Sequence, residues 1–255
     1  MPTSRKMDRN PVRRDLGLAR KVALACRILA SQGLFKETTG HVSARNRDGE
    51  TMLIRGRGRA ESGLLFTRPG DVVLADLEGR GIQRGSRLAP PNEACIHGEL
   101  YKARAEVSSV VHAHPASVVL CSIAGIELRP IYGGYDPQGM RLAIQGIPVY
   151  QSSLTLHDRE QVQAMMEVMG SSEVCILRGH GMVVVGRSIE EATVKSIKLE
   201  ALAQMNLRAA SLGSVPSISE EDIKVFFTGR GLGGRSFEPV WRYYSRCVEK
   251  RTVKV

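Results

Sequence analysis

Two histidines spaced two residues apart, His112 and His114, carry the clearest chemical signal in this sequence of 255 residues. They lie at the end of an apolar run over 107–112 that favours a buried strand. Side chains at positions i and i+2 of a strand point to the same face, so both imidazoles can reach one ion. The spacing alone is equally typical of a buried hydrogen-bonded pair of histidines. Further candidate ligands must therefore decide between the two interpretations.

His180 is the third candidate ligand, because it lies between two glycines directly after a predicted strand over 174–177. Such a turn lets the backbone approach closely and present one side chain into a cleft. Three neutral imidazoles suit borderline divalent metals and leave coordination positions open, as catalytic sites do. The pattern predicts a catalytic metal held by His112, His114 and His180.

Glu93 lies at the start of a predicted helix over about 92–104, one turn before His97. A glutamate in the first turn of a helix is ordinary dipole-complementing chemistry, which is the structural interpretation of Glu93. The functional interpretation is a carboxylate near the metal that moves protons to and from a carbon atom. His97 then either orients Glu93 or packs below it, and we favour a structural role.

The elements that must position these side chains alternate irregularly between strand and helix. Hydrophobic periodicity and turn signals predict helices over 15–32, 92–104 and 188–211, with two more after Pro115 and from Asp158. Strands are predicted over 41–45, 52–54, 71–76, 107–112, 147–150, 174–177 and 182–185. This order indicates a single α/β domain with a mixed or antiparallel sheet flanked by helices.

Composition excludes several classes of protein. The formal net charge of +10 raises the question of nucleic acid, but only 5% of residues are aromatic and no nucleic-acid-binding motif is present. We expect the positive field to attract a small anionic substrate instead. No apolar run reaches the roughly 18–20 residues that cross a bilayer.

The five cysteines are odd in number, widely spaced and without a CxxC pair. This pattern is typical of reduced thiols in a cytosolic protein, not of a disulfide frame or a thiolate metal site. The first residues are basic but lack the apolar stretch of a secretion signal, so we expect a cytoplasmic protein.

Four motifs occur in one order: TTGHVSAR (38–45), Glu93-x-x-x-His97, VVHAHP (110–115) and RGHG (178–181). In residue type, order and spacing they resemble the class II aldolase/adducin family over about residues 15–212. The resemblance implies one α/β/α domain with a central, mostly antiparallel sheet flanked by helices. It also implies a homo-oligomer, commonly a tetramer, with active sites at subunit interfaces.

The same resemblance assigns roles to individual residues. It makes His112, His114 and His180 the metal ligands, with zinc the usual ion and manganese, iron or cobalt as alternatives. It makes Glu93 the acid/base carboxylate. It also places Tyr132 near a tyrosine that assists proton transfer in the aldolase branch.

The sequence departs from the sugar-phosphate aldolases where they hold the phosphate. His41 stands in place of an asparagine, and Pro91-Asn92 in place of a Ser-Ser pair, so one N–H donor is lost. Arginines occur instead, and guanidinium groups suit carboxylates. We therefore expect the substrate to contact five residues: His41, Arg55, Arg57, Asn92 and Arg178. For each arginine of the 55–59 run, a solvated turn is the alternative.

These changes resemble the decarboxylase branch of the family, which acts on hydroxylated aromatic carboxylates such as 3,4-dihydroxyphthalate in the breakdown of aromatic compounds. The predicted activity is a metal-dependent lyase. The metal stabilises the enolate-like anion left when CO2 departs, and Glu93 protonates the carbon. An aldolase acting on a sugar phosphate or hydroxy-keto acid, and a non-enzymatic adducin-like module, are the alternatives.

The resemblance also divides the chain. A basic segment over 1–14 precedes the catalytic domain over 15–212. A tail over 213–255 follows, and it either covers an active site, its own or a neighbour's, or packs on its own domain.

Overall fold

The computed structural model describes residues 15–82, 85–227 and 236–252, and the predicted basic segment over 1–14 lies outside them. In the described chain a seven-stranded sheet has the order β3-β2-β1-β4-β7-β6-β5. All neighbouring strands are antiparallel except the parallel pair β5–β6, which confirms the predicted mostly antiparallel sheet. The strands are β1 (His41–Arg45), β2 (Thr51–Arg55), β3 (Val72–Asp76), β4 (Ser109–Ala113), β5 (Val149–Tyr150), β6 (Val174–Leu177) and β7 (Gly181–Gly186).

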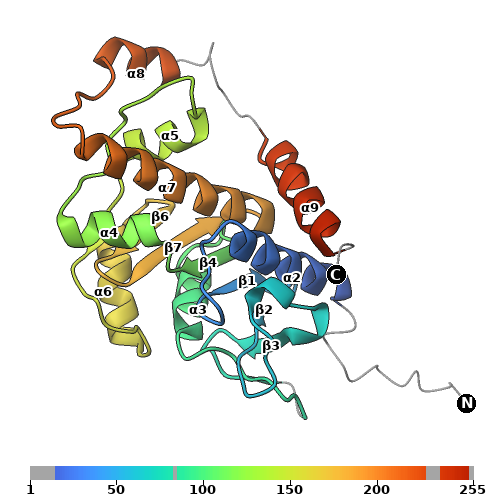
Figure 1. The fold of residues 1–255 in the computed structure, drawn as a ribbon. Helices are drawn as coiled ribbons and strands as arrows, with labels where there is room; N and C mark the ends of the chain where they lie inside the picture. Colours follow the sequence, from blue (N-terminus) through green and yellow to red (C-terminus); the bar gives the residue numbers. More distant parts are fainter. Residues whose placement is uncertain (1–14, 83–84, 228–235, 253–255) are drawn as a thin grey trace, which may run out of the picture.

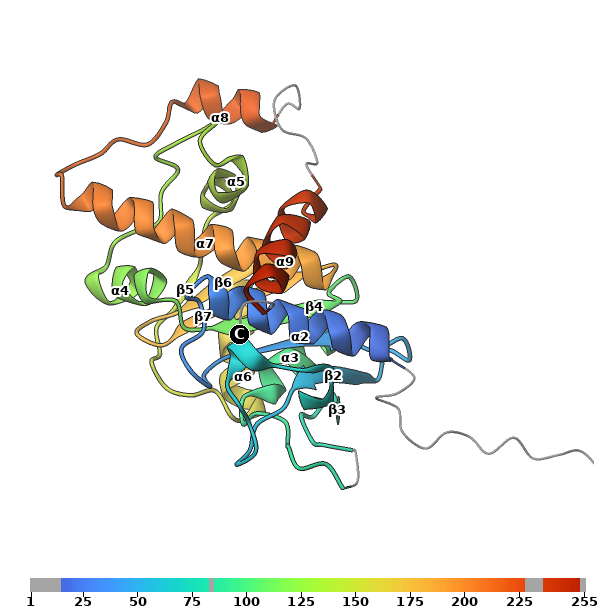
Figure 2. The same ribbon diagram turned by 45° about the vertical axis from the view of Figure 1, so that its right-hand side comes forward.

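Helices cover both faces of this sheet (Figures 1 and 2). They are α2 (Leu16–Ser31), α3 (Ala94–Ala103), α4 (Ala116–Ala124), α5 (Pro137–Gln145), α6 (Arg159–Met169), α7 (Ile189–Ala210), α8 (Glu220–Phe227) and α9 (Glu238–Thr252), with short 3-10 turns at Leu64–Phe66 and Pro69–Asp71. Helix α7 begins where predicted, because the hydroxyl of Ser188 accepts a hydrogen bond from the backbone N–H of Glu191.

The alternation of side chains along the strands builds two cores. Val42 and Val111 pack with α2 and α7 in the larger core, whereas Val110 and Val183 pack with α3 and α6 in the smaller one. Residues that alternate with Val42 and Val111 therefore face α3 and α6. His112 is one of these residues, which places it on the side of the sheet covered by α3 and α6.

Strand register brings a second histidine to the same place. In the antiparallel pair β1–β4, His41 is the direct partner of His112, and in the pair β4–β7 the partner of His112 is Val183. Directly opposed residues point to the same face of a sheet. The centre of the sheet thus presents two imidazoles side by side toward α3.

Part of the predicted tail folds back as helix. Helix α9 packs against α2 and α7, with Trp241 and Val248 buried in the larger core. Because the histidines face the opposite side of the sheet, α9 does not cover the site of its own chain. The expectation that the tail covers a neighbour's site stays a prediction. The helical spacing of Trp241, Tyr244 and Val248 could have predicted α9 from the sequence.

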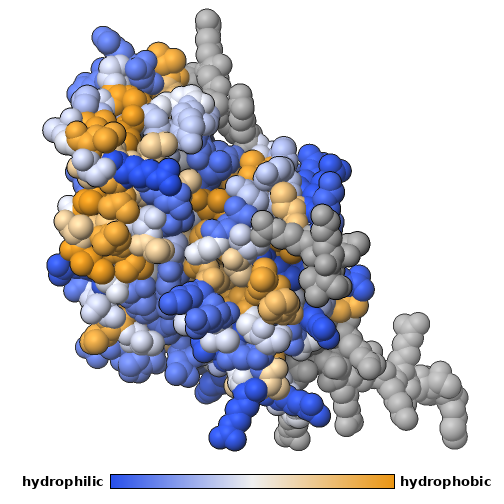
Figure 3. Space-filling view, in the orientation of Figure 1, coloured by the Kyte–Doolittle hydropathy of each residue, from blue (hydrophilic) through white to orange (hydrophobic). Residues whose placement is uncertain are grey.

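Hydrophobic side chains also lie on the surface, where Figure 3 shows them gathered over α4 at the left. Leu120 is 48% and Ile123 55% exposed. Apolar patches of this kind commonly mark contacts with another protein. The predicted homotetramer would supply such a contact and stays a prediction. Among the described helices, none is long and apolar enough to cross a membrane.

Candidate active site

The ends of three strands position the predicted metal ligands. His112 belongs to β4, His114 follows the end of that strand, and His180 lies in the turn that joins β6 to β7. This turn passes very close to β4. A side chain at Gly181 would collide with the carbonyl of Ala113 and with the ring of His114, so glycine is required there.

The three imidazoles and the Glu93 carboxylate converge on one point. One donor atom from each of these four residues lies within 4.8 Å of the others. The Nε2 atoms of His112 and His114 are 2.9 Å apart. The Glu93 oxygens lie 3.3 Å from Nε2 of His112 and 3.6 Å from Nε2 of His180. Four residues predicted from separate motifs therefore form one cluster.

Backbone carbonyls determine which ring nitrogens face the cluster. Nδ1 of His112 lies 3.1 Å from the carbonyl oxygen of Met182, and Nδ1 of His180 lies 3.1 Å from that of Leu154. A carbonyl only accepts hydrogen bonds, so each Nδ1 carries the proton and each Nε2 presents a lone pair. Lone pairs and carboxylate oxygens that face one another repel unless a cation lies between them. This donor set, oriented through its outer nitrogens, fits a divalent metal.

The electrostatics of the cluster favour the same forms of these groups. Burial lowers the pKa of His114 to about 3 and also lowers the pKa of His180. Burial raises the pKa of Glu93, but its contacts with His112 and His41 outweigh this, and the pKa falls well below its usual value. Neutral imidazoles and an ionised carboxylate are the forms that bind a metal.

Glu93 is the residue before the first turn of α3, yet its side chain makes no capping hydrogen bond to that helix. Its carboxylate instead accepts a hydrogen bond from the backbone N–H of Leu156 at 3.2 Å and faces the histidines. The side chain of Glu93 therefore does not cap α3 through a hydrogen bond. His97 does not orient Glu93 directly either, because its two ring nitrogens contact His41 and Ser43.

A cavity of about 440 Å³ opens beside the cluster. Its walls include the carboxylate-bearing residue Glu93, one of the predicted ligands and three of the predicted substrate contacts. Listed along the chain, the lining residues are Thr39, Gly40, His41, Arg57, Gly58, Glu61, Pro91, Asn92, Glu93, His114 and Thr155. Nε of Arg57 lies 3.2 Å from Glu61, which holds the guanidinium at the wall.

Three other predicted site residues lie outside this wall. Arg55 is only 2% exposed, and its guanidinium forms an ion pair with Glu61. This buried ion pair holds the segment after β2 in place. Arg178 is exposed in the turn before His180. The ring of Tyr132 packs edge-on against Tyr135. Its role in proton transfer and the substrate role of Arg178 stay predictions.

The structure adds contributions that no sequence motif indicated. The loop before α6 supplies the N–H of Leu156 to Glu93 and the carbonyl of Leu154 to His180. Thr155, between them, lines the cavity. Backbone groups are common to all residue types, so this loop carried no signal in the sequence.

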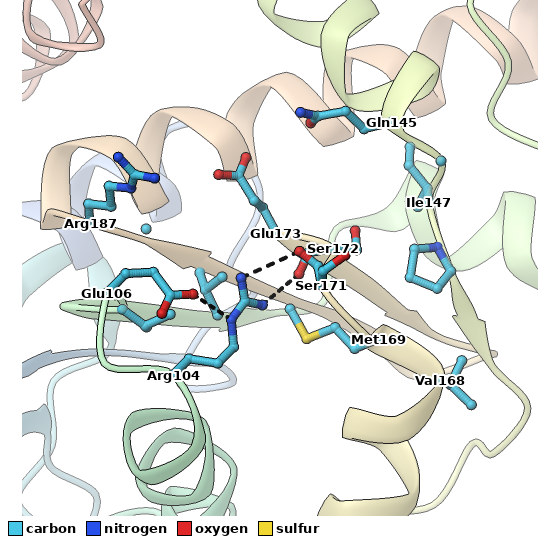
Figure 4. Close-up of a pocket in the computed structure, with 15 residues that line it drawn as sticks. Arg104, Glu106, Gln145, Ile147, Val168, Met169, Ser171, Ser172, Glu173 and Arg187 are labelled. Atoms are coloured by element: carbon cyan, nitrogen blue, oxygen red, sulfur yellow. Dashed lines mark hydrogen bonds and ion pairs between the residues drawn. The ribbon is translucent and has the colours of Figure 1, made fainter.

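A second hollow of about 730 Å³ lies near the other end of β7, as Figure 4 shows. Arg104 lines this hollow, but its guanidinium is already paired, because it donates to the carbonyls of Ser172 and Ser171 and to Glu106. Glu173 is paired with Lys195. No histidine or cysteine lines this hollow in the described chain, so the metal-ligand cluster remains the candidate site.

Comparison with known proteins supports the same assignment. Residues 20–207 match the model of the Class II Aldolase and Adducin N-terminal domain. The 3,4-dihydroxyphthalate decarboxylase of Arthrobacter keyseri is 39% identical over 232 residues, 89% of this chain and 92% of that protein. That of Terrabacter sp. is 40% identical over 205 residues, 79% of this chain and 85% of that protein. A solved aldolase II superfamily protein from Pseudomonas syringae has a TM-score of 0.80 at 22% identity, covering 96% of each chain.

The chain belongs to the class II aldolase/adducin family. It is a lyase of that family with a glutamate–histidine cluster suited to a divalent metal, and it is related to 3,4-dihydroxyphthalate decarboxylases. The similarity to the Pseudomonas syringae structure supports the fold alone.

Proposed function

We propose that this chain is a decarboxylase of a hydroxylated aromatic carboxylate, with 3,4-dihydroxyphthalate as the substrate and zinc as the metal. The observation that carries the proposal is the wall of the cavity beside Glu93. Arg57 and His41 line it, and the backbone there includes Pro91, which has no N–H to offer a phosphate. A guanidinium suits a carboxylate in this position. The related decarboxylases support the proposal.

The substrate is expected to lie between the metal ligands and Arg57. Arg57 holds one carboxylate of the ring, and Asn92 supplies an amide beside it. The other carboxylate, which is lost, then lies near Glu93. An ion bound by His112, His114 and His180 would supply a Lewis acid that stabilises negative charge on an oxygen next to the breaking bond.

Glu93 is suited to move one proton, because its carboxylate lies both in the histidine cluster and at the cavity wall. It accepts the proton of the ring hydroxyl beside the departing carboxylate and passes that proton to the ring carbon. The carbon–carbon bond then breaks, its electron pair returns to the ring, and CO2 leaves. The phenolate oxygen of the product then regains a proton from water.

Turnover of three substrates by the zinc-loaded protein tests this proposal. We expect CO2 release from 3,4-dihydroxyphthalate. Phthalate, which has no hydroxyl groups, should bind without reacting. Faster cleavage of fuculose 1-phosphate than of 3,4-dihydroxyphthalate would overturn the proposal in favour of an aldolase. A purified chain that takes up no divalent ion would instead favour a non-enzymatic module.

A further inference from the structure

Behind Glu93 lies a chain of four hydrogen-bonded side chains. The hydroxyls of Tyr101 and Ser43 are 2.6 Å apart, and the Ser43 hydroxyl is 2.6 Å from Nδ1 of His97. Nε2 of His97 is in turn 2.7 Å from Nδ1 of His41. All four residues are at most 2% exposed. The Nδ1 edge of His41, which contacts His97, is therefore shielded from bulk water, while the ring faces the site.

The Glu93 carboxylate, which lies beside His41 at one end of this chain, determines the direction of the hydrogen bonds. Nε2 of His41 lies 3.8 Å from a Glu93 oxygen, and an ionised carboxylate only accepts hydrogen bonds. A proton on Nε2 of His41 leaves Nδ1 of that ring as an acceptor. Nε2 of His97 must then donate, and Nδ1 of His97 must accept from the Ser43 hydroxyl. Tyr101 completes the chain by donating to Ser43.

The opposite direction would place a lone pair of His41 against the Glu93 carboxylate. The ring centroids of His41 and His112 are only 5.0 Å apart, so this lone pair would lie next to the metal ligands. His41 would then be available as a further nitrogen ligand, and it would offer no donor to an anionic group in the cavity.

The structure assigns Ser43, His97 and Tyr101 as positioning residues that hold His41 in its Nε2–H tautomer. In this form the Nε2–H of His41 faces the Glu93 carboxylate at 3.8 Å and can donate to the substrate anion, and His41 is not a competing metal ligand. The inference rests on the proposed function for its consequence in catalysis. The tautomer itself can be measured whether or not the chain decarboxylates anything.

Ser43→Ala tests the chain at its least disruptive point, because it removes only the hydroxyl that donates to His97. Ser109→Ala is the matched control. Ser109 is equally buried on the neighbouring strand, and its hydroxyl donates to the backbone carbonyl of Ser43 at 2.7 Å, outside the chain. Nitrogen-15 NMR of the histidine rings in the zinc-loaded full chain reports the tautomer, and His41→Gln identifies the His41 signals.

We expect Nε2 of His41 to carry the proton in the unsubstituted protein. The same tautomer is expected in Ser43→Thr, which keeps the hydroxyl, and in Ser109→Ala, which leaves the four hydrogen-bonded side chains unchanged. Ser43→Ala should shift the proton of His41 toward Nδ1. It should also lower kcat for the proposed substrate by about tenfold or more while zinc content stays within about twofold.

An unchanged His41 tautomer in Ser43→Ala would overturn the inference. So would an equal loss of kcat in Ser109→Ala, since that result would indicate general damage to the strand. If Ser43→Ala does not fold, His97→Phe keeps a ring in the buried space and removes the donor to His41, with the same shift expected. If the tautomer shifts as expected but no decarboxylation is seen with any variant, the proposed function fails and the positioning chain stands.

Discussion

The Nε2 atoms of His112 and His114 lie 2.9 Å apart. The Nε2 atom of His112 presents a lone pair, because Nδ1 of that ring donates to the carbonyl of Met182. Metal–nitrogen bonds of about 2.0–2.1 Å bring two ligands of one ion to roughly 3 Å from each other. The separation is compatible with two ligands of one shared ion, so His112 in the strand and His114 just beyond its end can act together.

His112→Ala is expected to abolish metal binding and activity together. The substitution removes the most buried ligand of the cluster and leaves the others without a common centre. Affinity for zinc should fall by more than about 100-fold, measured by metal analysis after dialysis against a competing chelator. His157→Ala is the control, because His157 is exposed outside the cluster. Full metal content in His112→Ala would remove this residue from the ligand set.

Glu93→Gln is expected to retain the metal and lose most turnover. The amide keeps the size of the side chain but cannot accept and return a proton, so kcat should fall by about 10²–10⁴-fold. Glu99→Gln, on the same helix, changes a carboxylate paired with Lys102 and should have little effect on kcat. Near-full activity in Glu93→Gln would mean that another group moves the proton.

Arg57→Ala is expected to raise KM more than it lowers kcat. A charge-assisted hydrogen bond to a carboxylate contributes about 1.5–3 kcal/mol, which corresponds to a rise in KM of roughly 10–100-fold. Arg59→Ala removes an exposed guanidinium two residues further along and should leave KM unchanged. Equal effects of the two substitutions would indicate a general electrostatic attraction in place of a specific contact.

The metal-free protein is expected to lose stability on mild acidification. Burial lowers the pKa of His41 from 6.5 to about 4, and that of His114 from 6.5 to about 3. Below pH 6.5 the unfolded chain therefore binds more protons, and the free energy of unfolding falls as the pH decreases toward the folded pKa values.

Each such histidine contributes a slope of about 1.4 kcal/mol per pH unit in this window. Urea unfolding at pH 7, 6 and 5 measures the slope, and His41→Gln should reduce it by the share of one proton. A free energy of unfolding that is constant between pH 7 and 5 would contradict the burial of neutral histidines.

Trp241→Ala is expected to destabilise the fold without changing the turnover of folded molecules. The indole is 8% exposed against the core that α2 and α7 share, and loss of a buried tryptophan costs about 3–5 kcal/mol. Thermal unfolding measures the destabilisation, and kcat is compared at a temperature where both proteins are folded. Loss of kcat with an intact fold would show that α9 reaches the active site of a neighbouring subunit.

Local sequence determined much of this protein. Alternation of period two and helical spacing depend on neighbouring residues, so most strands, and helices such as α2 and α7, were predicted close to their observed bounds. The pairing of His112 with His114 is local in the same way, because two positions along a strand suffice to bring them to one face. The glycines around His180 likewise indicated a close approach before its partner was known.

Only the tertiary structure determined which side chains the site residues contact. Strand register placed His41 opposite His112, and register depends on pairing between segments far apart in the chain. Arg55 and Arg57 look equivalent in the sequence, yet the burial of Arg55 with Glu61 leaves only Arg57 at the cavity. Long-range packing also placed His97 and Ser43 behind His41, since a hydrogen bond between side chains is determined by where whole elements lie and not by the order of residues.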